Sequence, residues 1–214
     1  MARGRFITFE GGEGTGKSTQ IARLAEALRG RGLSVVQTRE PGGSPGAEAL
    51  RALLVNGEAG RWTPTAEALL MYAARDDHLN QVIRPALERG DWVLCDRFSD
   101  STRAYQGAGG KVDATFIEAL DMAVVGADRP DLTLIFDLEP QAGLERAKAR
   151  AGGEDRFESK GEGFHRRLRE GFLKIAEAEP DRCRIIDAGG SVDAVGSAVW
   201  EALRERWPGE LGDG

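Results

Sequence analysis

Gly11-Gly12-Glu13-Gly14-Thr15-Gly16-Lys17-Ser18 is the stretch that decides the fold of this 214-residue chain. It fits the pattern G-x-x-x-x-G-K-[ST], in which glycines let successive backbone N–H groups turn inward on phosphate oxygens at a helix N-terminus. Lys17 adds a mobile positive charge, and the Ser18 hydroxyl suits Mg²⁺, the hard cation that accompanies nucleoside triphosphates. The stretch predicts a triphosphate-binding loop made of Gly11, Gly12, Glu13, Gly14, Thr15, Gly16, Lys17, Ser18 and Thr19.

The residues on either side of this loop have the pattern that such a motif needs. Residues 5–9 are typical of a short strand, and apolar side chains then follow at helical spacing, at Ile21, Leu24, Ala25 and Leu28. A strand before the loop and a helix after it distinguish a phosphate-binding loop from a chance glycine turn. We therefore interpret the stretch as a nucleotide-binding loop.

Composition limits the class of protein. With 41% hydrophobic and 30% charged residues, the chain suits one sizeable core. A net charge of −6 argues against a general nucleic-acid binder, which needs a basic face. Cys95 and Cys183 lie in apolar, strand-like runs and are expected to be buried free thiols in a reducing compartment. No stretch approaches the ~20 apolar residues that span a bilayer, and no signal-peptide core follows the N-terminus, so we expect a cytoplasmic protein without a membrane partner.

Strands and helices alternate along the rest of the chain. Further strands are predicted at residues 33–38, 92–96, 132–138 and 183–187. Helix starts are predicted at Thr63-Pro64, Asp113, Pro140 and Ser191, and Pro85 is expected to kink or break the helix that begins at Pro64. The alternation predicts one doubly wound α/β domain over residues 1–208 with a mostly parallel sheet, followed by a disordered tail at 209–214.

Two predicted strands end in residues that suit a phosphate site. In open parallel sheets, ligands bind at the carboxyl ends of the strands. The strand at 33–38 leads into Arg39, Glu40 and Pro41, and the strand at 92–96 ends in Asp96 followed by Arg97. Asp96 is expected near Mg²⁺ beside Ser18, and Arg97 near a phosphate. The alternative is that Asp96 and Arg97 form an ordinary surface pair.

Six short motifs extend this interpretation along nearly the whole chain. They are Phe9-Glu10-Gly11-Gly12-Glu13-Gly14, Thr38-Arg39-Glu40-Pro41-Gly42-Gly43, Ala73-Ala74-Arg75, Asp96-Arg97-Phe98, Ala104-Tyr105-Gln106-Gly107 and Arg129-Pro130-Asp131-Leu132-Thr133. In this order and spacing they resemble bacterial thymidylate kinases. The resemblance implies ATP-dependent phosphorylation of dTMP to dTDP with Mg²⁺. It also implies a three-layer P-loop kinase fold with a five-stranded, mostly parallel sheet, a short mobile lid and usually a homodimer.

The resemblance also implies roles for individual residues. Glu13 is similar to an acid that meets the 3′-hydroxyl of the acceptor sugar, Arg97 and Arg39 to contacts of the acceptor phosphate, and Tyr105 to a residue that packs on the sugar and excludes ribose. Arg75 and Gln106 resemble base readers, since a guanidinium can donate to O4 of thymine and an amide can pair with the N3 edge. The implied dTMP-binding set is Glu13, Arg39, Glu40, Pro41, Met71, Arg75, Arg97, Ser101, Thr102, Tyr105 and Gln106.

Two positions qualify this comparison. Relatives commonly carry a phenylalanine that stacks on thymine four residues before the base-reading arginine, and here that residue is Met71. A thioether can also lie against a π face. For Arg75 the alternative is a solvated charge on a helix surface.

The last predicted feature is a lid at about residues 148–160. This stretch is basic from Lys148 through Arg150 to Arg156, and Gly152-Gly153 gives it freedom to close over ATP. Some relatives place an arginine right after the P-loop acid, where this chain has Gly14, so we assign the transition-state charge to the lid. The predicted catalytic residues are Lys17, Asp96, Arg97, Arg150 and Arg156. The alternative for the lid is a solvated charged turn.

Two other functions remain open at this point. The first is another nucleoside monophosphate kinase or a deoxynucleoside kinase, which a panel of acceptors would distinguish. The second is a nucleotide-regulated switch or scaffold, which would need no acceptor pocket. The acceptor-side residues and the absence of an Asn-Lys-x-Asp motif argue against a guanine-nucleotide switch.

Overall fold

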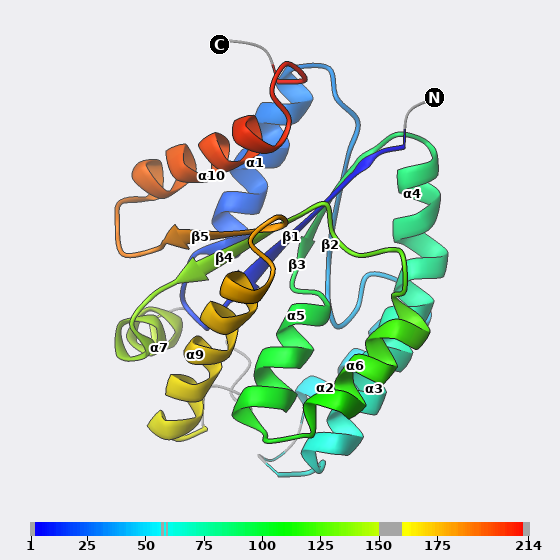
Figure 1. The fold of residues 1–214 in the computed structure, drawn as a ribbon, viewed down its shortest axis with the longest axis vertical. Coiled ribbons are helices and arrows are strands. Elements are labelled where there is room, and N and C mark those ends of the chain that lie inside the picture. The colour runs from blue at the N-terminus through cyan, green and yellow to red at the C-terminus, as the bar shows by residue number, and fades with distance from the viewer. Residues whose placement is uncertain (1–2, 57, 59, 150–159, 212–214) are drawn as a thin grey trace.

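The computed structural model describes residues 3–56, 58, 60–149 and 160–211. Five strands form one sheet in which every neighbouring pair is parallel, in the order β2-β3-β1-β4-β5. The strands are β1 Arg5–Gly11, β2 Val35–Arg39, β3 Trp92–Asp96, β4 Leu132–Asp137 and β5 Cys183–Asp187. Figure 1 shows β1 in the middle of this twisted sheet. The predicted five-stranded α/β architecture is confirmed.

Helices cover both faces of the sheet and complete three layers (Figure 1). On one face α1 (Lys17–Gly30) packs against α10 (Val192–Arg206) and shares with it the largest hydrophobic cluster. On the other face lie α3 (Pro64–His78), α6 (Ala114–Val124) and α9 (Glu162–Ala178). Two shorter helices, α2 (Pro45–Val55) and α7 (Pro140–Lys148), follow β2 and β4.

The predicted helix caps are present. The side chains of Thr63 and Ser191 each accept a hydrogen bond from the N–H three residues on, and Asp113 accepts from two backbone N–H groups. Each cap satisfies a donor that the first helical turn leaves without an intrahelical partner. These helices therefore begin where the sequence places them.

Pro85 changes the hydrogen-bond pattern of its helix from α to π, and the helix continues past it. The helix α3 continues through a π-helical turn, η1 (Leu79–Ile83), into α4 (Arg84–Glu88). The N–H of Arg84 bonds to the carbonyl of Leu79, five residues back. A wider turn accommodates a residue that has no N–H to donate and whose ring crowds the preceding turn.

Two segments are more regular than their composition indicates. Residues 101–110 are polar and glycine-rich, yet they lie mostly in a helix formed by α5 (Ser99–Thr102) and the π-helical η2 (Arg103–Gly109). The expected disorder from residue 209 does not hold for residues 209–211, because Leu211 is buried in the cluster of α1 and α10 and its carbonyl accepts from Arg31 Nε. Residues 212–214 lie outside the described part of the chain.

The cysteines and the apolar segments were the basis for predicting the compartment of the protein. Cys95 and Cys183 are both free and buried, as predicted. Among the helices that the structure describes, none combines the length and the apolar character needed to cross a bilayer.

Candidate active site

The phosphate-binding loop connects β1 to α1 at the carboxyl edge of the sheet. Gly16, directly before the helix, has a φ of 86°, which favours glycine. Gly14 has a φ of 69°, and a Cβ there would lie 1.9 Å from the carbonyl oxygen of Gly143 at α7. Glycine at position 14 is thus required both by the backbone conformation and by the close approach of α7.

The Lys17 ammonium lies inside its own loop. Nζ donates to the carbonyl oxygens of Gly11 at 3.2 Å and Gly12 at 2.8 Å, and to the Thr15 hydroxyl at 3.2 Å. Burial, together with the nearby charge of Arg97, lowers the pKa of Lys17 to about 8, although neighbouring carboxylates oppose the shift. In the described part of the chain, the buried ammonium thus donates to two carbonyl oxygens and a hydroxyl, and phosphate oxygens would be stronger partners.

The side-chain oxygens of Ser18 and Asp96, which are predicted to bind a metal, lie next to each other. The Ser18 hydroxyl donates to Asp96 Oδ2 at 2.8 Å, across the gap between α1 and the end of β3. Within the described ranges no group of three or more His, Cys, Asp or Glu side chains could hold a metal. Mg²⁺ commonly takes only one or two protein oxygens, with water and phosphate as its other ligands, so the pair fits this ion.

Arg97 lies between the loop and the helices that follow β3. Its φ of 69° is unusual for a residue with a side chain. Its guanidinium donates from Nη2 to Glu13 Oε1 at 2.9 Å and from Nη1 to the Gly11 carbonyl at 2.8 Å, and it lies over the ring of Tyr105. Arg97 thus lies against the phosphate-binding loop, and its contact with a phosphate stays a prediction.

Glu13 is held in its ionised form. The Tyr105 hydroxyl donates to Glu13 Oε1 at 2.6 Å, the same oxygen that accepts from Arg97. Burial raises the pKa of Glu13, but Arg97, Lys17 and the Tyr105 hydroxyl together lower it to about 2. Glu13 therefore presents a carboxylate at neutral pH, able to accept a hydrogen bond from a sugar hydroxyl.

Arg75 of α3 lies near the end of β2 and the helix that follows β3. It is 1% exposed, so the alternative of a solvated surface charge is wrong. Nε donates to Glu40 Oε2 at 2.8 Å and Nη2 to the Thr102 hydroxyl at 3.1 Å. Among the residues that the structure describes, its buried Nη1 has no hydrogen-bond partner. Because an unsatisfied buried donor costs free energy, this atom marks a place for an acceptor on a ligand.

Glu40 anchors Arg75 from the end of β2. Its second carboxylate oxygen lies 3.0 Å from His78 Nδ1, and His78 Nε2 lies 2.6 Å from the Thr38 hydroxyl. Glu40 thus has partners for both oxygens and fixes the direction of the Arg75 guanidinium. The sequence analysis placed Glu40 in the acceptor site but missed His78, which follows Arg75 by three residues and therefore lies on a neighbouring face of the same helix.

The sequence model of the thymidylate kinase family matches residues 9–199 of this chain. The chain belongs to the thymidylate kinase family. It is 62% identical to thymidylate kinase of Caulobacter vibrioides over 96% of this chain and 99% of the relative. It is 56% identical to thymidylate kinase of Afipia carboxidovorans over 95% of this chain and 90% of that relative. A crystal structure of thymidylate kinase from Ehrlichia chaffeensis superposes with a TM-score of 0.77 at 34% identity, over 94% of this chain and 99% of that one.

Other residues implied by the family resemblance lie at the same edge with different partners. Arg39 is level with Asp96 in the sheet, but its Nη2 pairs with Glu48 of α2 at 3.0 Å. The Pro41 carbonyl accepts from Arg51 at 2.7 Å. In this conformation Arg39 is thus paired with α2. Ser101, Thr102, Tyr105 and Gln106 share one helical segment, and Met71 packs against the cluster that contains Tyr105. Thr19 is exposed on α1, and the lid residues Arg150 and Arg156 lie outside the described residues.

Glu10 is a member of the site that the sequence analysis did not single out. It is fully buried, and it accepts from the N–H of Phe98 at 2.8 Å and from the Ser101 hydroxyl at 2.5 Å. Burial, with Asp100 nearby, raises the pKa of Glu10 to about 8. The two hydrogen bonds that Glu10 accepts fix the start of α5, directly after Arg97. A charged residue inside an apolar strand, directly before the loop, is the signal that could have found it.

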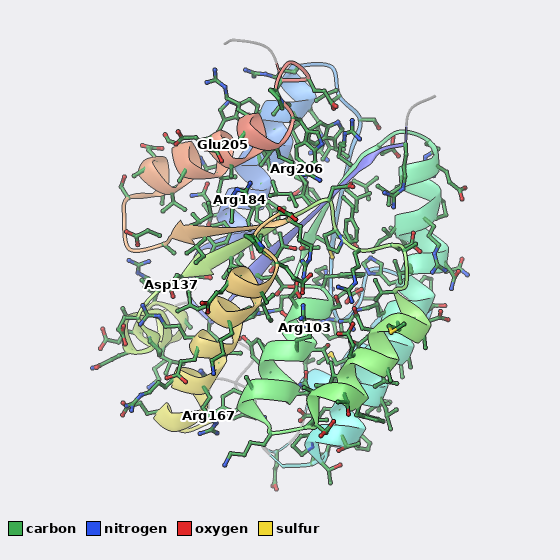
Figure 2. All side chains as sticks on the ribbon, viewed as in Figure 1. Arg103, Asp137, Arg167, Arg184, Glu205 and Arg206 are labelled. Carbon is green, nitrogen blue, oxygen red and sulfur yellow. The ribbon has the colours of Figure 1, made fainter. Side chains whose placement is uncertain are left out.

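Two further ion pairs brace the site. Arg182, directly before β5, donates to both oxygens of Asp100 in α5, at 2.7 and 2.9 Å. Asp137, at the end of β4 and labelled in Figure 2, accepts two hydrogen bonds from Arg169 of α9. Asp137 and Arg169 both line a small pocket bounded by the phosphate-binding loop, α7 and α9. These pairs link distant segments and gave no local sequence signal.

Proposed function

We propose that this protein transfers the terminal phosphoryl group of ATP to dTMP and releases dTDP, as a step in the supply of dTTP. The observation that carries the proposal is the buried Nη1 of Arg75, a donor without a partner on the acceptor side of a phosphate-binding loop. It matches the O4 acceptor of thymine. Membership of the thymidylate kinase family supports the same substrate.

On the donor side, the loop N–H groups and Lys17 would hold the phosphates of ATP. Ser18 and Asp96 would hold Mg²⁺, which supplies positive charge beside the phosphate oxygens. Phosphoryl transfer depends mainly on two phosphates being held in line and on neutralising their charge. Arg150 and Arg156 of the lid are proposed to add charge at the transition state.

On the acceptor side, the proposed roles follow the family resemblance, and the contacts of Arg97, Glu13 and Arg75 described above support them. Arg97 would bind the phosphate of dTMP, with Arg39 as a second contact that would first have to leave Glu48. Glu13 would accept from the 3′-hydroxyl, and Tyr105, fixed on Glu13, would pack against the sugar. Arg75 and Gln106 would read the base.

We also propose that the protein is a cytoplasmic homodimer. Three large apolar side chains are exposed on neighbouring helices: Leu53 of α2 (40% exposed), Leu69 of α3 (48%) and Met122 of α6 (69%). A second copy of the chain that packs on these helices would cover these side chains. Light scattering at micromolar concentration tests it, and a monomer mass would refute the dimer.

A panel of acceptors tests the function. The purified protein is given ATP, Mg²⁺ and one of dTMP, dUMP, dGMP, dCMP or thymidine, and formation of ADP and the phosphorylated product is followed. We expect dTMP to be the best acceptor. Preference for another monophosphate, or for thymidine, would indicate a different nucleotide or nucleoside kinase. ATP hydrolysis that no monophosphate stimulates would instead favour a nucleotide-regulated switch.

A further inference from the structure

Two helices face each other across the acceptor site through paired side chains. Glu67, Met71 and Arg75 lie four residues apart on α3 and therefore share one face of that helix. Opposite them, Thr102 and Gln106 lie four residues apart on the helical segment after β3. Arg75 Nη2 donates to the Thr102 hydroxyl at 3.1 Å, and Gln106 Nε2 donates to Glu67 Oε2 at 3.2 Å. The two helices are thus joined by one hydrogen bond on either side of Met71.

The contact with Glu67 determines which way the Gln106 amide points. A carboxylate can only accept hydrogen bonds, so the amide must turn its NH₂ group towards Glu67. Glu67 is 2% exposed and Gln106 is 1% exposed. In such a buried place a reversed amide would set its carbonyl oxygen against the carboxylate and leave acceptors facing each other. Lys160 Nζ lies 4.0 Å from the same carboxylate and adds a positive charge beside it.

The fixed amide leaves its carbonyl oxygen for the base. Among the hydrogen bonds of the described residues, none is accepted by Gln106 Oε1. The site therefore offers a donor, Arg75 Nη1, and an acceptor, Gln106 Oε1. Thymine and uracil match this pair, since O4 accepts and N3–H donates. Cytosine has the opposite pattern, with an amino donor and an N3 acceptor, so it is mismatched at both atoms.

We propose that Glu67 is a positioning residue that makes the site reject cytosine nucleotides, by fixing the Gln106 amide with its carbonyl oxygen towards the base. The proposal rests on the proposed function, because it takes the base of dTMP to lie between Arg75 and Gln106. Glu67 does not touch the nucleotide in this proposal. It acts only through Gln106.

The test compares Glu67→Gln with the parent enzyme. An amide at position 67 can accept or donate, so Gln106 becomes free to turn its NH₂ towards N3 of cytosine. We expect the inhibition constant of dCMP to fall at least ~10-fold, the value of about one hydrogen bond, while the KM for dTMP changes less than ~3-fold. The ratio of kcat/KM for dTMP and dUMP stays unchanged, because both bases present the same edge. Unchanged dCMP inhibition, or an equal loss for all three nucleotides, would overturn the proposal.

Three further variants separate positioning from general damage. Glu67→Asp keeps an acceptor-only side chain and is expected to keep the rejection of dCMP. Asp76→Asn changes an exposed carboxylate of the same helix and is expected to change nothing. In a Gln106→Met background, Glu67→Gln should have no effect on dCMP, because the amide through which it acts is gone. An effect that persists there would contradict the proposal.

Two outcomes keep this proposal distinct from the proposed function. If the parent enzyme does not phosphorylate dTMP, the proposed function is wrong. If it phosphorylates dTMP and rejects dCMP, yet Glu67→Gln leaves dCMP inhibition unchanged, only the role of Glu67 is wrong. Melting temperatures of all variants show which are folded, and Glu67→Met, which has no hydrogen-bonding group, replaces Glu67→Gln in the same test if the latter does not fold.

Discussion

The phosphate side and the acceptor side of this site are built in different ways. The proposed phosphate side is nine consecutive residues, 11–19, in which backbone groups and Lys17 would hold the phosphates. The acceptor side is assembled from the end of β2, from α3 and from the helix after β3, through buried pairs such as Arg75 with Glu40. We therefore expect substitutions on the phosphate side to lower turnover and substitutions on the acceptor side to lower the affinity for dTMP.

The largest expected effect is that of Lys17→Met. Removing a preorganised charge from the phosphate side should lower kcat about 10²- to 10³-fold, while the KM for dTMP stays near that of the parent enzyme. Steady-state kinetics with each substrate varied measures both. Lys174→Met, an exposed lysine of α9, is the matched control. A parallel loss of dTMP affinity would show that the two sides are not separable.

Arg75→Ala should have the converse effect. Losing a donor to a buried base edge costs about 1–3 kcal/mol, which corresponds to a rise in the KM for dTMP of roughly 5- to 150-fold, with the KM for ATP near normal. Unchanged dTMP kinetics would refute the role of Arg75.

The same variant leaves Glu40 buried without its ion-pair partner, which should lower the free energy of unfolding by about 3–5 kcal/mol. Arg75→Ala/Glu40→Gln removes the uncompensated charge. Denaturant unfolding should therefore show partial recovery of stability, whereas the weak binding of dTMP persists. Recovery of dTMP affinity as well would mean that Arg75 acts through stability alone.

The proposed function assigns the predicted lid arginines to the phosphate side. Arg150→Ala or Arg156→Ala is predicted to lower turnover at least ~10-fold with little change in the KM for dTMP, because an arginine that meets the phosphates on closure stabilises the transition state more than the ground state. Single-turnover kinetics checks the chemical step, with Arg166→Ala on the exposed surface of α9 as the control. A double lid variant that turns over at the parental rate would leave Lys17, Arg97 and Mg²⁺ to meet the charge.

The phosphate side should also respond to pH. The pKa of Lys17 is lowered to about 8, so its positive charge is lost as the pH rises through that value. In the free enzyme kcat/KM for ATP should therefore fall about tenfold per pH unit above pH 8, and kcat should fall only at higher pH because bound phosphates favour the charged form. The pH profile of Lys17→Met should lack this falling limb above pH 8. A limb that remains in the variant would point to Glu10, whose pKa is also raised to about 8.

The sequence predicted the parts of the molecule that depend on local patterns. The strands at Trp92–Asp96 and Cys183–Asp187 are continuous runs rich in apolar residues, and the caps at Thr63, Asp113 and Ser191 are local hydrogen bonds. The pairing partners of charged residues were not predictable in this way. Arg39 pairs with Glu48, Arg182 with Asp100 and Gln106 with Glu67, and each partner is determined by how separate elements pack against one another.

Met71→Phe is expected to have the smallest effect and bears on the acceptor side alone. Met71 is partly buried and packs against the cluster that contains Ala104 and Tyr105. A sulfur–aromatic contact contributes about 0.3–1.5 kcal/mol and an aromatic pair about 0.5–1.5 kcal/mol, so the ranges overlap. A difference under about 1 kcal/mol corresponds to a fall in the KM for dTMP of less than roughly fivefold.

The same factor should apply to dUMP, because stacking on the ring face does not distinguish the polar edges of the two bases. The KM for ATP is the internal control, since position 71 belongs to α3 and not to the loop. A gain well above tenfold would show that the thioether makes little contact with the base in the parent enzyme. A loss would show that the space beside Tyr105 is too small for a phenyl ring, and that the acceptor side is adapted to methionine at this position.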